Sequence, residues 1–462
     1  MLKSIIRLIR QSLSEVEHDY TSGSIKKGIF LLAVPMMLEM AMESFFALVD
    51  TFFVGKIGHG ALTTVGLTEV MMTLVYSIAI GLSTAPMAMV ARFVGEKNPE
   101  AAGKAAGQAI LLSIFVSLLI AVPGFIYAEE LLGLMGASEA VVRQGAGYTR
   151  IMFATNVVIM LLFVINGIFR GAGEAAKAMR VLWLANGINI VLDPIFIFGF
   201  GPIPGFGVEG AAIATSIGRG VGVAYQLYLL FGDRSSIKLG TRAWVVDWNM
   251  QERIARIAST GAFQYLIASA SWVFLMRIVA DFGDAAVAGY TVAIRLIIFT
   301  MLPAWGLANA AATFVGQNLG AKLPDRAEKG VWTTLRVTSI YLLALSFVYY
   351  FLAGPLVQTF AEEAEVVNYG ITTLKVFAIG YVFFGVGMIP IQAFNGAGDT
   401  RTPTLVNFVC FWLMEIPLGY FLGVSMGYGV EGVVWAVVTA EAMLGVLAVY
   451  LFRLGKWKSV EV

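Results

Sequence analysis

Acidic residues inside long apolar segments are the side chains of this sequence best suited to do chemistry. In the first half of the chain they are Glu39, Glu43, Asp50 and Asp193. The second half offers mainly Glu415 and Glu441. A charged side chain at the centre of a membrane costs about 2.5–3.5 kcal/mol on insertion scales, so such residues are functional candidates by default.

Asp50 and Asp193 are predicted to contribute to one cation site. Counting along their segments at about 1.5 Å per residue places Asp50, Asp193 and Thr215 at one level, in the outer half of the membrane. Asn189 precedes Asp193 by four residues and shares its helical face. Pro194 leaves a carbonyl of the preceding turn underbonded. These oxygens suit a hard cation such as Na⁺, and the two carboxyl groups could instead share a proton, because burial and mutual repulsion favour protonation.

A structural interpretation of the same residues stays open. In it, Asp50 caps or braces neighbouring helices, and Asp193 merely pairs with Asn189.

A second polar stripe is predicted on the first apolar segment. Glu39 and Glu43 are four residues apart, and Glu43 precedes Asp50 by seven, so the three acids share a helical face. With Met36 and Met40 they are predicted to line a substrate cavity that attracts cationic compounds. Alternatively, the two glutamates are hydrogen-bond partners of interior hydroxyl groups or of water.

Two further residues of these segments have predicted roles. Pro35 interrupts the first apolar segment and is a possible hinge. Tyr148, at the outer end of the fourth segment, is interpreted as an anchor at the membrane interface.

The elements that must position these residues are membrane-spanning helices. The chain has 462 residues, of which 58% are hydrophobic and 13% charged, whereas soluble domains carry about 25% charge. A span needs about 20 mostly apolar residues. The predicted spans are 29–53, 62–91, 105–127, 148–168, 181–200, 211–231, 256–280, 286–314, 334–353, 371–394, 404–424 and 431–452.

Charge distribution supports this count and sets the orientation. Lys and Arg concentrate at both termini and in alternate connections, which predicts that both termini are cytoplasmic. The predicted organisation is a cytoplasmic arm at 1–27, a six-helix lobe at 28–231, a cytoplasmic linker at 232–255, a second six-helix lobe at 256–452 and a cytoplasmic tail at 453–462.

The two lobes are copies of one another. Phe169-Arg-Gly-Ala-Gly-Glu174 recurs as Phe394-Asn-Gly-Ala-Gly-Asp399, Gly205-Phe-Gly-Val-Glu-Gly210 as Gly427-Tyr-Gly-Val-Glu-Gly432, and Val94-Gly95 as Val315-Gly316. An even number of helices per copy makes both enter the membrane from one side. We therefore expect an all-α membrane protein of two pseudo-symmetric six-helix bundles, related by an axis along the membrane normal and suited to alternating access. The comparable helices of the second lobe offer mainly Glu415 and Glu441, and this asymmetry favours a functional over a structural role for the acids of the first lobe.

Other classes of function are disfavoured. The formal net charge of +1 provides no field for nucleic acid. Cys410 is the single cysteine, and His18 and His59 are the only histidines, so thiolate and histidine-rich metal centres are not expected. The phosphate-binding pattern G-x-x-x-x-G-K-[ST] does not occur. We expect neither an enzyme nor an organic cofactor.

Seven short motifs carry a family resemblance. They are Val49-Asp-Thr-Phe-Phe-Val-Gly55 after Pro35, Val94-Gly-Glu-Lys-Asn98, Asn166-Gly-Ile-Phe-Arg-Gly-Ala-Gly173, Asn189-Ile-Val-Leu-Asp-Pro194, Gly210-Ala-Ala-Ile-Ala-Thr215, Val315-Gly-Gln-Asn-Leu-Gly-Ala321 and Asn395-Gly-Ala-Gly-Asp399. Together and in this order they resemble the multidrug and toxic compound extrusion (MATE) transporters over almost the whole chain. The resemblance implies cation-coupled antiport of organic, often cationic compounds out of the cytoplasm.

The resemblance also implies a particular ion site. In one branch of the family the cation is held in the N-terminal lobe by residues matching Asp50, Asn189, Asp193 and Thr215, with a backbone carbonyl matching Ala211. Another branch has acids on the seventh and tenth helices. Here the seventh carries Gln264 where the repeat pairs it with Glu39, and the tenth has no acid. This departure argues against a C-terminal ion site.

The preferred function is therefore an H⁺- or Na⁺-coupled exporter of small amphipathic, often cationic compounds, expected as a monomer in the cell (inner) membrane. The alternative is a flippase for lipid-linked saccharide or phospholipid, which would need a basic cleft. Only Arg219, Arg277 and Arg295 are basic residues well placed within spans.

Overall fold

The computed structural model describes residues 2–14, 18–232 and 234–462, without the side chains of 2–5 and 59. The predicted arm at 1–27 includes residues 1 and 15–17, which lie outside the described residues.

The described chain is almost entirely helical. The described residues form sixteen α-helices: α1 Leu2–Ser12, α2 Ile25–Gly55, α3 His59–Gly95, α4 Pro99–Ile126, α5 Ala128–Leu134, α6 Glu139–Ala154, α7 Asn156–Gly171, α8 Ala175–Phe198, α9 Val208–Phe231, α10 Trp248–Ala280, α11 Asp284–Gly320, α12 Pro324–Gln358, α13 Ala364–Ala397, α14 Arg401–Asn407, α15 Ile416–Tyr420 and α16 Gly429–Arg453. Two π-helical segments, Phe408–Glu415 and Phe421–Ser425, continue α14 and α15, and short 3₁₀ helices cover Thr241–Trp244 and Lys456–Ser459.

The twelve predicted spans correspond to helical segments of the described chain, apart from Tyr127 after α4, Thr155 between α6 and α7, and residues 199–200 after α8. Ten helical segments of the described chain are long and apolar enough to cross a membrane, and the bent pair α6 and α7 makes an eleventh. The one predicted span not among these eleven is 211–231. It lies in α9, whose 24 residues are enough to cross a membrane. Polar residues such as Arg219 and Gln226 make α9 less apolar than the other spans.

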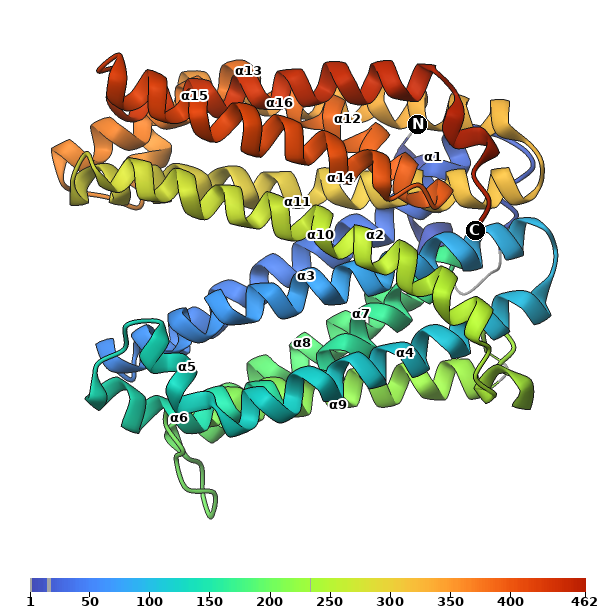
Figure 1. Cartoon of the computed structure of the whole chain (residues 1–462), viewed down its shortest axis with the longest axis horizontal. Coiled ribbons are helices and arrows are strands. Elements are labelled where there is room, and N and C mark those ends of the chain that lie inside the picture. The colour runs from blue at the N-terminus through green and yellow to red at the C-terminus, as the bar shows by residue number, and fades with distance from the viewer. Residues whose placement is uncertain (1, 15–17, 233) are drawn as a thin grey trace. The chain divides into compact units, whose positions relative to one another are not determined.

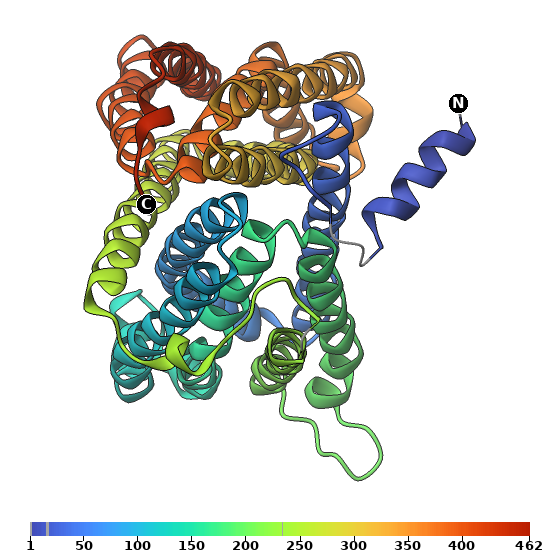
Figure 2. The same cartoon turned by 90° about the vertical axis from the view of Figure 1, so that its right-hand side faces the viewer.

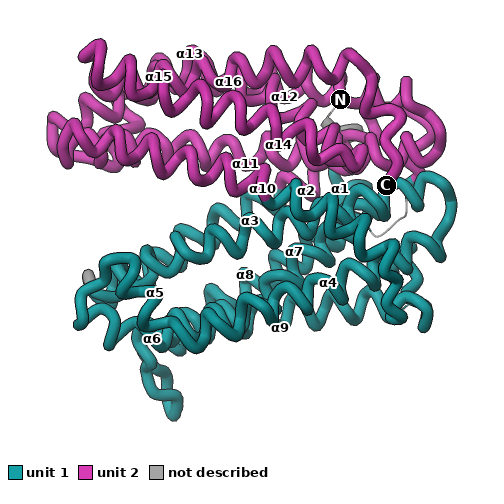
Figure 3. The backbone as a smooth tube through the Cα atoms, viewed as in Figure 1, with its two compact units in different colours: residues 1–18, 38–262 teal, residues 19–37, 263–462 magenta. Residues whose placement is uncertain are grey.

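The chain divides into two compact units, coloured separately in Figure 3. Unit 1 comprises residues 1–18 and 38–262, and unit 2 comprises residues 19–37 and 263–462. The division passes through α2, two residues after Pro35. The predicted first lobe begins at residue 28, with the first membrane span. The first turns of α2, up to Met37, nevertheless belong to unit 2, because most of their contacts are with that unit.

The two units share a packing pattern, which accords with the internal repeat. In unit 1, α7 packs against α3, α4 and α9, and in unit 2, α13 packs against α11, α12 and α16. These are equivalent helices of the two copies: the fourth span of each half contacts the second, third and sixth. The long helices of each unit run side by side in Figure 1 and are seen nearly end-on, as a bundle, in Figure 2.

The fourth span is broken, which the hydropathy of the sequence did not reveal. α6 and α7 meet at an angle of 40° across Thr155. The Thr155 hydroxyl donates to the carbonyl of Ile151 (2.7 Å), and Asn156 Nδ2 donates to the carbonyl of Phe153 (2.9 Å). The backbone N–H of Thr155 also donates to the carbonyl of Ile151 (2.9 Å), so the hydroxyl is a second donor to that carbonyl, and both side chains add hydrogen bonds at the bend.

The segment between α9 and α10 is docked on α4. Gln108, fully buried on α4, donates through Nε2 to the carbonyls of Ala243 (2.9 Å) and Val245 (2.8 Å). Its Oε1 accepts from the backbone N of Asp247 (3.0 Å) and from Gln251 Nε2 (2.9 Å). One side chain thus orders the end of the linker and the start of α10.

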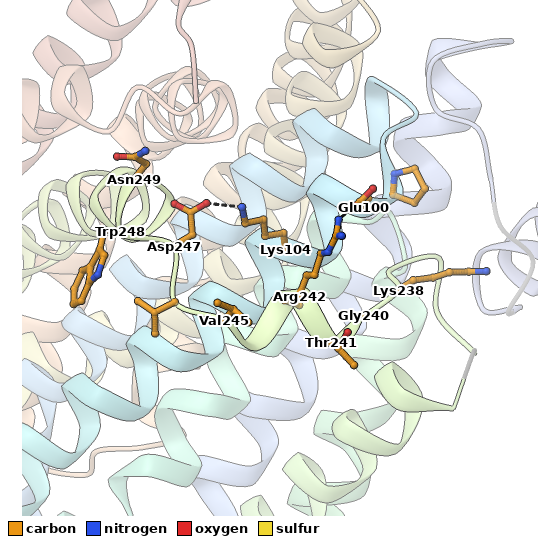
Figure 4. Close-up of a pocket in the computed structure, with 13 residues that line it drawn as sticks. Glu100, Lys104, Lys238, Gly240, Thr241, Arg242, Val245, Asp247, Trp248 and Asn249 are labelled. Atoms are coloured by element: carbon orange, nitrogen blue, oxygen red, sulfur yellow. Dashed lines mark ion pairs between the residues drawn. The ribbon is translucent and has the colours of Figure 1, made fainter.

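Charged residues surround this contact. The segment and the start of α4 line a pocket of about 1000 Å³, where Asp247 forms an ion pair with Lys104 (Figure 4). The hydrogen bond from Lys104 lowers the pKa of Asp247 below its usual value, with help from the backbone N–H of Met250. Asp247 therefore remains ionised throughout the neutral range.

We expect Gln108→Leu to release this segment. The change leaves buried carbonyl groups without donors, at a cost of about 1–3 kcal/mol. Tryptic cleavage at Lys238 and Arg242 of the protein in detergent should rise by about tenfold. The exposed Glu252→Gln serves as the control, and equal cleavage of the wild type and both variants would contradict this role of Gln108.

Candidate functional site

The interior of unit 1 carries the predicted cation-site residues on three helices: Asp50 on α2, Asn189 and Asp193 on α8, and Ala211 and Thr215 on α9. Spacings of four residues align the pairs on α8 and α9 along single helical faces.

Close packing brings α8 and α9 together at this point. A Cβ atom at Gly218 would lie 2.7 Å from the carbonyl oxygen of Ala185 and 3.0 Å from Cβ of Asn189. Only glycine therefore allows α9 to approach α8 this closely, which places Thr215 within hydrogen-bonding distance of Asn189.

Asp193 is hydrogen-bonded to Asn189, and Asn189 is hydrogen-bonded to Thr215. The Asn189 amide is oriented by its neighbours: Nδ2 donates to Asp193 Oδ2 (2.8 Å), and Oδ1 accepts from the backbone N (2.8 Å) and the hydroxyl (3.0 Å) of Thr215. Asp193 is 0% exposed, and its Oδ1 has no hydrogen-bond partner in the described part of the chain. This oxygen is free to accept a proton or to bind a cation.

Asp50 completes the predicted set. It is half-buried and within electrostatic range of Asp193, although no direct hydrogen bond joins the two carboxyl groups among the described contacts. Ala211 is buried one helical turn before Thr215. The structure thus brings the five residues into one neighbourhood.

Arg219 is a charged neighbour that the sequence analysis considered only for the flippase. It follows Thr215 by four residues on α9, is 8% exposed, and donates through Nη1 to the hydroxyl of Tyr76 (3.1 Å). Asp50 and Glu43 lie within its electrostatic range. The four-residue spacing from Thr215 could have identified it. A fixed positive charge beside the carboxyl groups partly balances them when no cation is bound.

Tyr148 does not serve as an interfacial anchor, contrary to its interpretation from the sequence. It is buried on α6, within electrostatic range of Asp50 and Glu69. Its position near the end of a predicted span suggested exposure, but α6 packs against α3, α4 and α9, and Tyr148 is buried.

Glu39 has protein partners. It is 1% exposed, and its Oε1 accepts from Arg170 Nη2 (2.7 Å) and Asn166 Nδ2 (3.3 Å). Gln226 Nε2 in turn donates to Asn166 Oδ1 (2.8 Å). The carboxylate is therefore neutralised by a buried ion pair that hydropathy could not predict.

The other predicted cavity residues differ in exposure. Glu43 is half-buried and accepts from Asn186 Nδ2 (3.0 Å). Met40 is half-buried, whereas Met36 and Pro35 are buried in the part of α2 that belongs to unit 2. Contact of any of these residues with substrate stays a prediction.

The donor set of the candidate site limits the ions that fit it. The described residues contain no group of three or more His, Cys, Asp or Glu side chains arranged to hold a metal ion. A cation here would be bound by two carboxylates and by the neutral oxygens of Asn189, Thr215 and the Ala211 carbonyl. Such a set suits Na⁺ or a proton and excludes a thiolate or imidazole centre from this neighbourhood.

The MatE family model matches this chain twice, at residues 35–195 and 261–421. The chain belongs to the MatE family. The two matched segments begin 226 residues apart, at positions 35 and 261, so each half of this MatE protein is one copy of the family unit and the internal repeat is confirmed.

Individual relatives extend over nearly the whole chain. An FAD transporter of Shewanella oneidensis is 27% identical and covers 94% of this chain and 96% of its own length. A probable multidrug resistance protein NorM of Thermotoga maritima is 24% identical, covering 94% of this chain and 93% of its own.

The solved structure of a multidrug resistance MATE family transporter in an outward-facing conformation superposes with a TM-score of 0.89 at 26% identity, covering 96% of this chain and 98% of that one. The predicted twelve-helix membrane fold is thereby confirmed.

Proposed function

We propose that this MatE protein is an antiporter that exports small organic compounds in exchange for H⁺ or Na⁺. Its coupling cation would bind at Asp50 and Asp193, assisted by Asn189, Thr215 and the Ala211 carbonyl. The observation that supports this most directly concerns Asp193 Oδ1, which is fully buried, has no hydrogen-bond partner among the described residues and lies within electrostatic range of Asp50. Arg219 balances the two carboxylates only in part, and negative charge left uncompensated in this environment is unfavourable, so cation binding and release can drive a conformational change.

The substrates are proposed to be amphipathic and often cationic. Names of the relatives support export of small molecules, since one is a probable multidrug resistance protein and another an FAD transporter. Half-buried Glu43 and Met40 provide a carboxylate and a polarisable surface for a cationic compound. We further propose that the protein acts as a monomer in the inner membrane, with both termini cytoplasmic.

Alternating access is proposed to involve Pro35. The α2 helix continues through this proline, and its residues change from one compact unit to the other between Met37 and Leu38. Pro35 removes one backbone hydrogen bond close to that change, which makes bending least costly there.

The flippase alternative is not favoured. A relative and a solved structure that are similar to this chain are both described as multidrug resistance proteins. Moreover, Arg219 is occupied with Tyr76, Arg277 pairs with Asp281 at the surface (2.6 Å), and Arg295 is exposed. These arginines do not provide the basic cleft that a pyrophosphate group would require.

Transport in proteoliposomes with separately imposed ion gradients tests the proposal. A gradient of the coupling ion directed against substrate movement should accumulate an ethidium-like cation, because one elementary charge crossing about 100 mV supplies about 2.3 kcal/mol. Either the proton or the sodium gradient should drive accumulation, and the ion that does so is the coupling ion. Equal substrate movement with both gradients collapsed would contradict antiport.

A further inference from the structure

Unit 2 contains its own pair of intramembrane carboxyl groups, Glu415 and Glu441. Glu415 ends the π-helical segment Phe408–Glu415 and is 2% exposed, whereas Glu441 is half-buried on α16, which packs against that segment. The two carboxyl groups are within electrostatic range of each other. No ion pair formed by the described residues includes either of them.

A tyrosine without a partner adjoins this pair. Tyr290 on α11 is 1% exposed, and its hydroxyl has no hydrogen-bond partner among the described residues, although Glu415 lies within its electrostatic range. A buried hydroxyl without a hydrogen-bond partner destabilises the fold. The burial of the Tyr290 hydroxyl is explained if the hydroxyl donates a hydrogen bond to a neighbouring carboxyl group that gains and loses a proton.

The internal repeat relates this cluster to the candidate site of unit 1. Separations of 221 and 222 residues connect the Val94 and Gly205 motifs with their second copies. The same separations pair Glu69 with Tyr290 and Arg219 with Glu441, whereas Asp193, which lies between the Phe169 motif with its separation of 225 and the Gly205 motif, corresponds to a position between 415 and 418. The cluster in unit 2 therefore occupies the equivalent place, but an acid replaces the arginine.

This replacement leaves unit 2 in need of an external positive charge. Arg219 partly balances the acids of unit 1, whereas Glu441 adds a second acid at the equivalent position. The surroundings are apolar: Val434, Val437 and Val438 belong to the main core cluster of the unit. The described residues provide no group of three or more His, Cys, Asp or Glu side chains that could hold a metal ion at this cluster.

Other titratable groups nearby do not supply that charge. Cys410 on the same π-helical segment is within electrostatic range of both glutamates and is not a cation. On α10, Arg277 is exposed and pairs with Asp281. We propose that Glu415 and Glu441 bind one proton between them, with Tyr290 as hydrogen-bond donor, so that the C-terminal unit has a protonation site of its own. This site is distinct from acids on the seventh and tenth spans, and it requires no assumption about transport.

Infrared difference spectroscopy of the purified protein in nanodiscs, recorded as the pH is lowered, tests the proposal. The wild type should show a protonated-carboxyl band containing a component that Glu415→Gln and Glu441→Gln each remove. Glu441→Asp should shift the frequency of that component while retaining it. Tyr290→Phe should also shift it without abolishing it, because only a hydrogen bond is lost.

The exposed Glu431→Gln on α16 is the matched control and should leave the spectrum unchanged. If a glutamine variant fails to fold, the conservative Glu441→Asp and Tyr290→Phe variants still report on the site. Identical spectra of the wild type and all variants would overturn the proposal. So would two independent components, one lost in each glutamine variant, or loss of the component on adding NaCl at constant pH.

Discussion

Asp193→Asn is expected to reduce gradient-driven export to the background of empty vesicles, and Asp50→Asn is expected to do the same. Asparagine keeps the size of the side chain but removes the negative charge. A hydrogen bond to a charged group contributes about 1.5–3 kcal/mol, so cation affinity should fall by about 10- to 150-fold. The measurement is substrate accumulation in proteoliposomes with the coupling-ion gradient imposed.

Controls distinguish lost coupling from lost folding. Asp284→Asn makes the same chemical change at an exposed position and should transport normally. Equilibrium binding of the substrate to detergent-purified Asp193→Asn should be retained, because the proposed cavity residues lie on α2 whereas Asp193 lies on α8. Export at the wild-type rate by both Asp50→Asn and Asp193→Asn would remove the site from the mechanism.

Much of this fold can be predicted from the sequence, because hydropathy identifies the segments that cross a membrane and the distribution of charge indicates their orientation. The twelve apolar segments are helical except at a few positions such as Thr155, and the motif repeat corresponds to equivalent packing of α7 and α13. The contact between Asn189 and Asp193 was also predictable, since residues four apart on one helix are neighbours whatever the surroundings.

Contacts between helices were harder to predict, because they depend on how each helix is rotated about its axis. Arg170 lies 131 positions beyond Glu39, and nothing in either segment identifies the other as its partner. Two local side-chain hydrogen bonds accompany the break at Thr155, which hydropathy does not indicate. Burial of Tyr148 likewise follows from the packing of α6, not from its position near the end of a span.

The buried ion pair between Glu39 and Arg170 leads to the largest expected effect on stability. Their side chains are 1% and 12% exposed, and Nη2 of Arg170 lies 2.7 Å from Oε1 of Glu39. Removing one member of such a pair leaves an uncompensated buried charge and costs about 3–5 kcal/mol. Arg170→Asn should therefore lower the thermal unfolding temperature in detergent sharply and reduce the amount of folded protein.

The second copy of the repeat shows how that loss can be reversed. A separation of 225 residues pairs Glu39 with Gln264 and Arg170 with Asn395, so both charges are replaced together in unit 2. The double variant Glu39→Gln, Arg170→Asn should accordingly recover most of the stability that Arg170→Asn loses, because no unpaired charge remains. A double-mutant cycle of unfolding temperatures measures this coupling. Additive losses would show that the two side chains stabilise unit 1 independently, and they would also weaken the case that Glu39 is neutralised by Arg170 rather than kept available for a cationic substrate.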